Sequence, residues 1–222
     1  MSADNLREAL VEEIRDLYNA EKQLVKALPK MAKGAESDEL REAFEEHLQE
    51  TEGQVTRLER VFELLDEKPR GKHCAGMAGI VEEGSEKLQE DIEGSVLDAV
   101  LIASAQKVEH YEIGAYGTAI AWAEALGLGE VCDVLNETLE EEKAADEKLS
   151  ALAESGINQA ATAGESDEEG EEMEEDEEEE EETVTRAGSR GGRQAEQPQA
   201  SASGGRQASA GSKSARARGG RR

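Results

Sequence analysis

Residues 98–118, DAVLIASAQKVEHYEIGAYGT, place a group of ionisable side chains in the middle of an otherwise apolar helix. The first half of this stretch is apolar enough to be buried in a protein core. Glu109, His110 and Glu112 then follow within four residues of one another. Because burying an unpaired carboxylate costs a large free energy, such a group normally takes up a proton instead. The stretch therefore predicts a core helix whose middle requires a compensating charge.

The composition around this stretch is typical of a helical protein. Only three of the 222 residues are proline, and aromatic residues make up 3%. Runs of Ala, Leu, Glu and Lys favour helices over sheets. We expect no membrane span, since no run approaches about 18 consecutive apolar residues, and no signal peptide in residues 1–16. Cys74 and Cys132 form no spacing motif, which predicts reduced cysteines and a cytoplasmic protein.

The pattern of apolar residues predicts an all-α domain over residues 1–156. The expected helices span residues 4–32, 38–66, 76–91, 95–126 and 129–154. Four of them are long, at roughly 40 Å for 25–30 residues, and four long helices indicate a four-helix bundle. The short helix, 76–91, lies in the connection between the second and third long helices.

The charge of the chain is strongly negative and unevenly distributed. The net charge is −28, and residues 1–162 carry 37 acidic and 16 basic side chains. A folded domain this acidic repels nucleic acid. Residues 157–222 lack large apolar side chains and are predicted to be a disordered tail, with an acidic run at 165–182 and then a basic end rich in Gly, Ser and Arg. We favour a solubilising or self-shielding tail over weak nucleic-acid contact by the basic end.

The inward stripe of each long helix is interrupted by polar residues near the helix midpoint. In the first helix the stripe is Leu10, Ile14, Leu17, Glu21, Leu24, Leu28 and Met31, with Glu21 its one polar member. Helix midpoints meet at one level of a bundle whichever way each helix runs, so the interruptions of all four helices are expected to converge. The residues at these interruptions, taken as candidate metal ligands, are Glu21, His47, Glu50, Glu109, Glu112, Glu142 and Asp146.

So many carboxylates in a low-dielectric core are unfavourable without a cation among them. Carboxylates together with imidazole suit iron or manganese, which predicts a site for two such ions. Two other interpretations remain open. The glutamates of the Glu-rich last helix can be solvated surface residues, and the acidic cluster can be protonated or paired with Lys22, Lys107 and His110. We place His110 beside the site rather than in it.

Four strings carry a resemblance to a known family: DLYNAEKQLVKALPKMA, FEEHLQETEGQVTRLE, DAVLIASAQKVEHYEIGAYGT and ETLEEEKAADEKL, in that order and spacing. Together they closely resemble the YciE/YciF-type family, which is ferritin-like, associated with stress and catalogued as a domain of unknown function. The likeness covers about residues 4–155, and the tail lies outside it.

The resemblance implies a ferritin-like four-helix bundle with a helical crossover after its second long helix, a two-metal centre and a homodimer. Glu21, Glu109 with Glu112, and Glu142 match glutamate ligands of the ferritin pattern. The Glu-x-x-His spacing of that pattern is absent, and His47 and Glu50 occur in the reverse order.

The implied function is a metal-binding stress protein whose metals react with oxygen or peroxide, although no enzymatic reaction is assigned. The alternative is a metal-free structural or interaction protein that keeps the bundle. An iron-storage shell is a third reading, which the small oligomers of the family disfavour.

Overall fold

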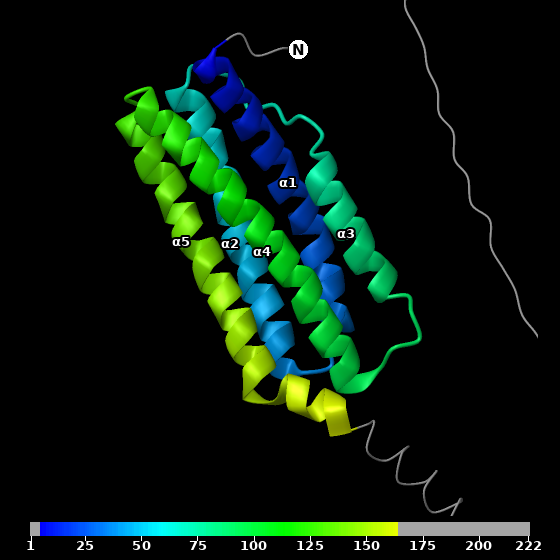
Figure 1. Cartoon of the computed structure of the whole chain (residues 1–222). Coiled ribbons are helices and arrows are strands. Elements are labelled where there is room, and N and C mark those ends of the chain that lie inside the picture. The colour runs from blue at the N-terminus through cyan, green and yellow to red at the C-terminus, as the bar shows by residue number, and fades with distance from the viewer. Residues whose placement is uncertain (1–4, 164–222) are drawn as a thin grey trace, which may run out of the picture. The chain divides into compact units, whose positions relative to one another are not determined.

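The structure, a computed structural model, describes residues 5–163 and is entirely helical or irregular there (Figure 1). Its elements are α1 (Leu6–Gly34), α2 (Asp38–Leu64), α3 (Ala75–Lys87), α4 (Gly94–Ala125), α5 (Gly129–Leu152) and a π-helical turn at Ala153–Ile157. No strand occurs in the described residues, so the predicted all-α class is confirmed.

The four long helices form a bundle in which each packs against two others. Helix α1 contacts α2 and α4, and α5 contacts the same two helices from the opposite corner. The crossover of residues 65–93 returns the chain along the bundle, so that α4 runs in the same direction as α2 (Figure 1). Its helix, α3, packs against both α1 and α4. One long crossover is the ferritin-like arrangement, as predicted.

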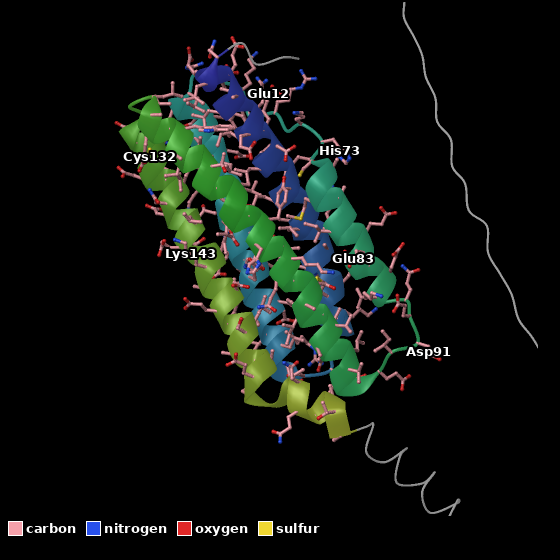
Figure 2. All side chains as sticks on the ribbon, viewed as in Figure 1. Glu12, His73, Glu83, Asp91, Cys132 and Lys143 are labelled. Atoms are coloured by element: carbon pink, nitrogen blue, oxygen red, sulfur yellow. The ribbon has the colours of Figure 1, made fainter. Side chains whose placement is uncertain are left out.

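Hydrogen bonds attach the connecting segments to the bundle. Asp98, near the start of α4, accepts from the backbone N–H groups of Glu36 (2.9 Å) and Ser37 (2.8 Å), which joins α4 to the α1–α2 connection. Asn19 of α1 accepts from the backbone N–H of Cys74 at 2.8 Å, which fixes the start of α3. His73, labelled in Figure 2, lies two residues before the first residue of that helix.

The helix ends follow local capping chemistry. Asn5 caps α1 by accepting from the Glu8 N–H at 3.0 Å, and α4 ends before Gly127, whose φ of 72° suits glycine. Helix α2 ends at Leu64 rather than at the predicted residue 66 because Asp66 adopts a φ of 54°. The Glu67 N–H then bonds the Phe62 carbonyl at 2.9 Å, which closes the helix end.

Two apolar clusters fill the bundle, and a layer of buried polar side chains lies between them. One cluster includes Leu10, Leu58, Tyr116 and Leu135. The other includes Leu24, Phe44, Ile102 and Leu149. We call the buried side chains between the clusters the polar layer: Glu21, His47, Thr51, Gln54, Glu109, Glu112, Thr138 and Glu142. Five of the seven predicted interruptions therefore lie in this layer, whereas Glu50 and Asp146 are not buried.

The end of the folded part differs from the predicted boundary at residue 156. Helix α5 ends at Leu152, the π-helical turn follows, and residues 158–163 are again helical. Gly156 lies inside the turn with φ 163° and ψ −23°, so it redirects the helical path rather than ending it. The acidic run at 165–182 and the basic end of the predicted tail lie outside the described residues.

Candidate metal centre

All four long helices contribute to the centre of the polar layer. Glu21 comes from α1, His47 from α2, Glu109 and Glu112 from α4, and Glu142 from α5. Glu109 and Glu112 share a helix face because they are three residues apart. Glu21, Glu112 and Glu142 are 0% exposed, so water does not solvate their carboxylates from outside.

Four of these side chains lie close enough together to surround one ion. One ligand atom each from His47, Glu109, Glu112 and Glu142 lies within 4.8 Å of all the others. His47 Nε2 is 3.4 Å from Glu109 Oε1 and 4.0 Å from Glu142 Oε2. With metal–ligand bonds of about 2.0–2.2 Å, ligand atoms on opposite sides of an ion are separated by about 4 Å. Small side-chain movements would therefore bring all four into contact with a metal ion.

Glu21 lies in the same layer but outside this group of four. The Tyr116 hydroxyl donates to Glu21 Oε1 at 2.5 Å, while Oε2 is buried without a donor. Burial and the charge of Glu142 raise the pKa of Glu21 to about 8. Glu21 is thus a buried carboxylate that Tyr116 holds by one oxygen, with its second oxygen free to bind a ligand.

The buried ligand atoms of the centre lack hydrogen-bond partners. Within residues 5–163, no side chain or backbone group donates a hydrogen bond to Glu21 Oε2, Glu109 Oε2 or either oxygen of Glu112 and Glu142. The carboxyl groups of Glu109 and Glu142 lie near each other, so a proton carried by one would bond to the other. His47 Nε2 is also unpartnered. No lysine or arginine of these residues forms an ion pair with the four glutamates. Since buried polar atoms are almost always satisfied, the centre is incomplete with protein atoms alone.

Burial raises the pKa of every glutamate in the centre. It raises that of Glu109 to about 8 and those of Glu112 and Glu142 well above the usual range, and neighbouring carboxylates add to the effect. For His47, burial lowers the pKa, but the contact with Glu50 and the charges of Glu142 and Glu21 outweigh it and raise the pKa. A cation at the centre would reverse these shifts by stabilising the carboxylate anions.

The two remaining predicted ligands lie at the margin. Glu50 is half-exposed, and its Oε2 lies 3.4 Å from His47 Nδ1, so it orients the imidazole. Asp146 is bonded by the Gln106 amide at 3.2 Å and lies 3.2 Å from His110 Nε2. It is not among the four clustered side chains. His110 is largely exposed, as its predicted place beside the site requires.

The sequence reasoning missed a cross-helix contact at the edge of the polar layer. Arg57 of α2 forms a two-pronged ion pair with Glu141 of α5 and donates to Thr138 Oγ1 at 3.0 Å. Gln54 donates to the same Glu141 carboxylate at 3.2 Å. The sequence signal that could have predicted this contact is the position of Arg57, which lies one helical turn after Gln54 of the inward stripe. Glu141 could not be distinguished within a run of three glutamates.

The bundle with one long crossover and the buried histidine–carboxylate layer define a ferritin-like helical protein. The chain belongs to the family described as a domain of unknown function (DUF892), whose model matches residues 5–162. It is 43% identical over 162 residues to protein YciF of Escherichia coli strain K12, covering 72% of this chain and 98% of that protein. The recognised resemblance is therefore confirmed.

Solved structures agree with this assignment. The crystal structure of the E. coli stress protein YciF matches with a TM-score of 0.68 and 43% identity, covering 70% of this chain and 99% of that one. YcfI of Rhodopseudomonas palustris matches with a TM-score of 0.66 and 44% identity over 68% and 97% of the two chains. A Xanthomonas campestris protein, 24% identical with a TM-score of 0.56 over 73% and 99%, shares the fold. Within the part of the chain that the structure describes, no helix has the length and apolarity to span a membrane.

Proposed function

We propose that this protein binds a pair of iron or manganese ions in the polar layer and uses them in reaction with oxygen or peroxide. The observation that carries the proposal is the set of buried carboxylate oxygens without donors around His47, whose ligand atoms lie within 4.8 Å of one another. The described residues supply the anions and the imidazole, and none of their lysines or arginines forms an ion pair with the four glutamates. Two divalent cations would balance the charge of four glutamates, and these ligand types suit iron and manganese.

The described side chains have distinct roles in this proposal. His47, Glu109, Glu112 and Glu142 would hold one ion, and Glu21 with the second oxygens of its neighbours would hold the other. Glu50 lies against His47 Nδ1 and would fix the imidazole so that Nε2 faces the ions. The Tyr116 hydroxyl fixes Glu21 in the same way. Asp146 remains a candidate ligand only if it exchanges its contact with His110 for the metal.

Bound iron or manganese would supply the electrons that reduce oxygen or peroxide. The chain itself contributes a centre bounded at both ends by the apolar clusters, which limit the access of water along the axis of the bundle. We assign no particular reaction. By resemblance to its family, we further propose that the protein acts in the cytoplasm as a homodimer under stress.

A metal-free structural role is the competing function, and the buried oxygens disfavour it. A scaffold without metal would leave Glu112 with both oxygens buried and unbonded, which costs free energy and adds nothing to packing.

Elemental analysis of protein purified without chelator tests the proposal. We expect up to two iron or manganese ions per chain in the native protein and almost none in a Glu21→Ala/Glu109→Ala double variant. A Glu52→Ala/Glu124→Ala variant, which removes exposed glutamates of α2 and α4, is the matched control and should retain the metal. Near-zero metal in the native protein, even after incubation with Fe²⁺ or Mn²⁺, would refute the proposal. Rapid mixing of loaded protein with peroxide then tests the redox chemistry.

A further inference from the structure

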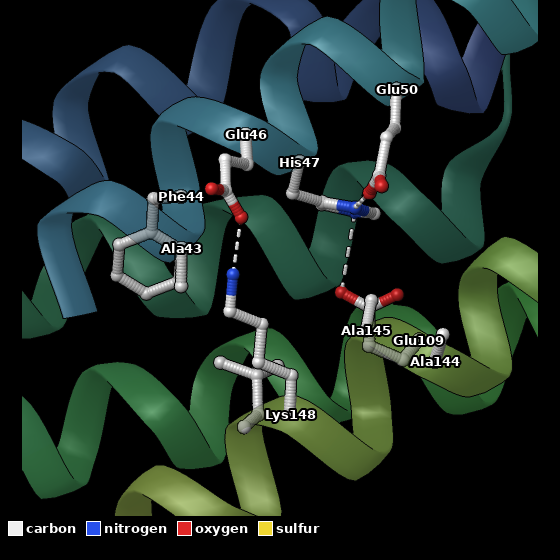
Figure 3. A pocket seen from close by; sticks show the side chains of 10 residues that line it. Ala43, Phe44, Glu46, His47, Glu50, Glu109, Ala144, Ala145 and Lys148 are labelled. Carbon is white, nitrogen blue, oxygen red and sulfur yellow. Dashed lines mark hydrogen bonds and ion pairs between the residues drawn. The ribbon is translucent and has the colours of Figure 1, made fainter. Parts of the chain in front are cut away.

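A cavity of about 100 Å³ between α2 and α5 extends to the metal centre (Figure 3). Its lining includes Glu46, His47 and Glu50 of α2, Glu109 of α4, and Ala145 and Lys148 of α5. We propose that this cavity is the path by which divalent cations enter and leave the buried centre, with the Glu46–Lys148 ion pair at its mouth. The inference rests on the proposed metal binding and adds to it the route and the groups that control it.

The lining changes from exposed to buried along the cavity. The side chains of Glu46, Glu50 and Lys148 are 54%, 47% and 45% exposed. Those of His47 and Glu109 are 8% and 2% exposed. His47 Nε2, which has no hydrogen-bond partner, and Glu109 are both candidate ligands. The cavity therefore joins solvent-facing carboxylates to the ligand atoms themselves.

Other approaches to the metal centre are covered by a helix or crossed by an ion pair. Helix α3 covers the side formed by α1 and α4. Farther along the α2–α5 interface, the Arg57–Glu141 ion pair bridges the two helices. Two other cavities, one bordered by α1, α3 and α4 and one by α1 and α2, include none of the candidate ligands. The small side chains of Ala144 and Ala145 leave the opening in the α2–α5 interface.

The charge of the lining favours a cation. Three carboxylates, those of Glu46, Glu50 and Glu109, face the cavity with Lys148 as its one lysine. Figure 3 shows Glu46 and Lys148 reaching toward each other across the opening, joined as an ion pair. An exposed pair of this kind is weak, so Lys148 can swing away from Glu46. Acidic clefts concentrate cations and accelerate their binding, whereas Lys148 opposes their approach.

Stopped-flow binding of Co²⁺, followed by its absorption in the metal-free full chain, tests the path. Ala145→Leu should fill the opening and slow association by about tenfold, which corresponds to about 1.4 kcal/mol in the barrier, while the equilibrium affinity stays unchanged. Ala151→Leu, at an exposed position of α5, is the matched control and should bind at the native rate.

The charges at the mouth provide a second, sign-specific test. Lys148→Gln should accelerate Co²⁺ association at low salt, and Glu46→Gln should slow it, each by a few-fold. Lys143→Gln removes the same charge from an exposed α5 lysine that pairs with Glu140 and should have a much smaller effect. Circular dichroism and the melting temperature of each variant confirm that it is folded.

The outcomes separate the path from the metal site. Native affinity with an unchanged association rate in both Ala145→Leu and Lys148→Gln would overturn the path and leave the metal site standing. Failure of the native protein to bind Co²⁺ at the centre would overturn the proposed function, and the path with it. Slowed association by Ala145→Leu, with opposite effects of Lys148→Gln and Glu46→Gln, would establish the path.

Discussion

Glu112 shows most clearly that the polar layer lowers the stability of the metal-free fold. Both of its carboxylate oxygens are buried without a donor, and burial followed by the charges of Glu21 and Glu142 raises its pKa well above the usual range. In the metal-free protein, folding therefore forces this group to keep a proton that the unfolded chain has already lost at neutral pH. The residue destabilises the fold unless a cation is present, which is typical of a functional rather than a structural position.

The substitution Glu112→Gln should stabilise the metal-free protein and abolish metal-induced stabilisation. Removing a carboxyl group that must be protonated on folding is expected to raise the free energy of unfolding at pH 7. Urea denaturation with and without chelator measures both effects. Glu124→Gln, an exposed glutamate of the same helix, should change neither. A destabilised metal-free Glu112→Gln protein would show that the carboxylate has a structural role.

The stability of the metal-free protein should fall as the pH rises from about 5 to 8. Burial raises the pKa values of Glu21 and Glu109 from 4.5 to about 8. Between these pH values the folded state binds protons that the unfolded state has lost. Each of the two carboxyl groups therefore lowers the free energy of unfolding by up to about 1.4 kcal/mol per pH unit. The stability that these two protonated groups contribute is fully present below pH 4.5 and is lost above pH 8.

Urea denaturation in chelator across this range measures the slope. A Glu21→Gln/Glu109→Gln variant is the control. Its free energy of unfolding should change less with pH, because two of the titrating carboxyl groups of the polar layer are absent. Bound metal should also remove the decline, since it holds the carboxylates deprotonated. Stability that rises with pH in the metal-free native protein would contradict the assigned shifts.

The burial of the candidate ligands was predictable from the sequence to the extent that burial follows helical periodicity. Glu21, Glu109, Glu112 and Glu142 interrupt apolar stripes, and the structure buries all four. Periodicity does not distinguish a ligand from its neighbours in a Glu-rich helix. For this reason Asp146 was grouped with Glu142, although it contacts Gln106 and His110 instead.

At the scale of the elements, the connections hold the polar layer in register. Asp98 of α4 binds two consecutive backbone N–H groups in the α1–α2 connection and is 3% exposed. These bonds join elements more than 60 residues apart in sequence, and they position α4 lengthwise against α1. The position of Glu109 and Glu112 relative to Glu21 therefore depends partly on Asp98.

Replacing Asp98 should weaken the bundle and disturb the centre. Hydrogen bonds to charged groups contribute about 1.5–3 kcal/mol each, so Asp98→Ala should lower the free energy of unfolding by at least about 2 kcal/mol. Asp133→Ala removes an exposed aspartate of α5 and serves as the control. Chemical denaturation measures both. An Asp98→Ala variant as stable as the native protein would show that the α1–α2 connection is held by other contacts.

The elements themselves were predicted to within a few residues where apolar stripes and glycine stops mark them. Helix α4 ends before Gly127 as expected. The errors fall at helix ends set by backbone geometry rather than by residue type, as at Asp66 and at the π-helical turn around Gly156. The crossover shows the same limit, since α3 ends at Lys87 rather than at residue 91.

At the scale of the whole molecule, the described domain is a bundle divided by the polar layer. Within the described residues, neither apolar cluster supplies hydrogen-bond donors to the carboxyl groups of this layer, apart from the Tyr116 hydroxyl on Glu21. The four-helix architecture follows from the sequence because each long helix has an apolar stripe. The pairing of the helices and the opening between α2 and α5 do not, since they depend on how side chains such as Ala145, Lys148 and Arg57 pack across helices. We propose that metal ions complete this layer.

Anomalous diffraction from crystals grown with Mn²⁺ or Fe²⁺, recorded at the absorption edge of the metal, tests this claim most directly. We predict two peaks about 3.5–4 Å apart, bounded by His47, Glu109, Glu112, Glu142 and Glu21. Crystals of Glu112→Gln protein grown in the same way should show weaker peaks or none. An absence of anomalous density from the polar layer of the native protein at saturating metal would contradict the account.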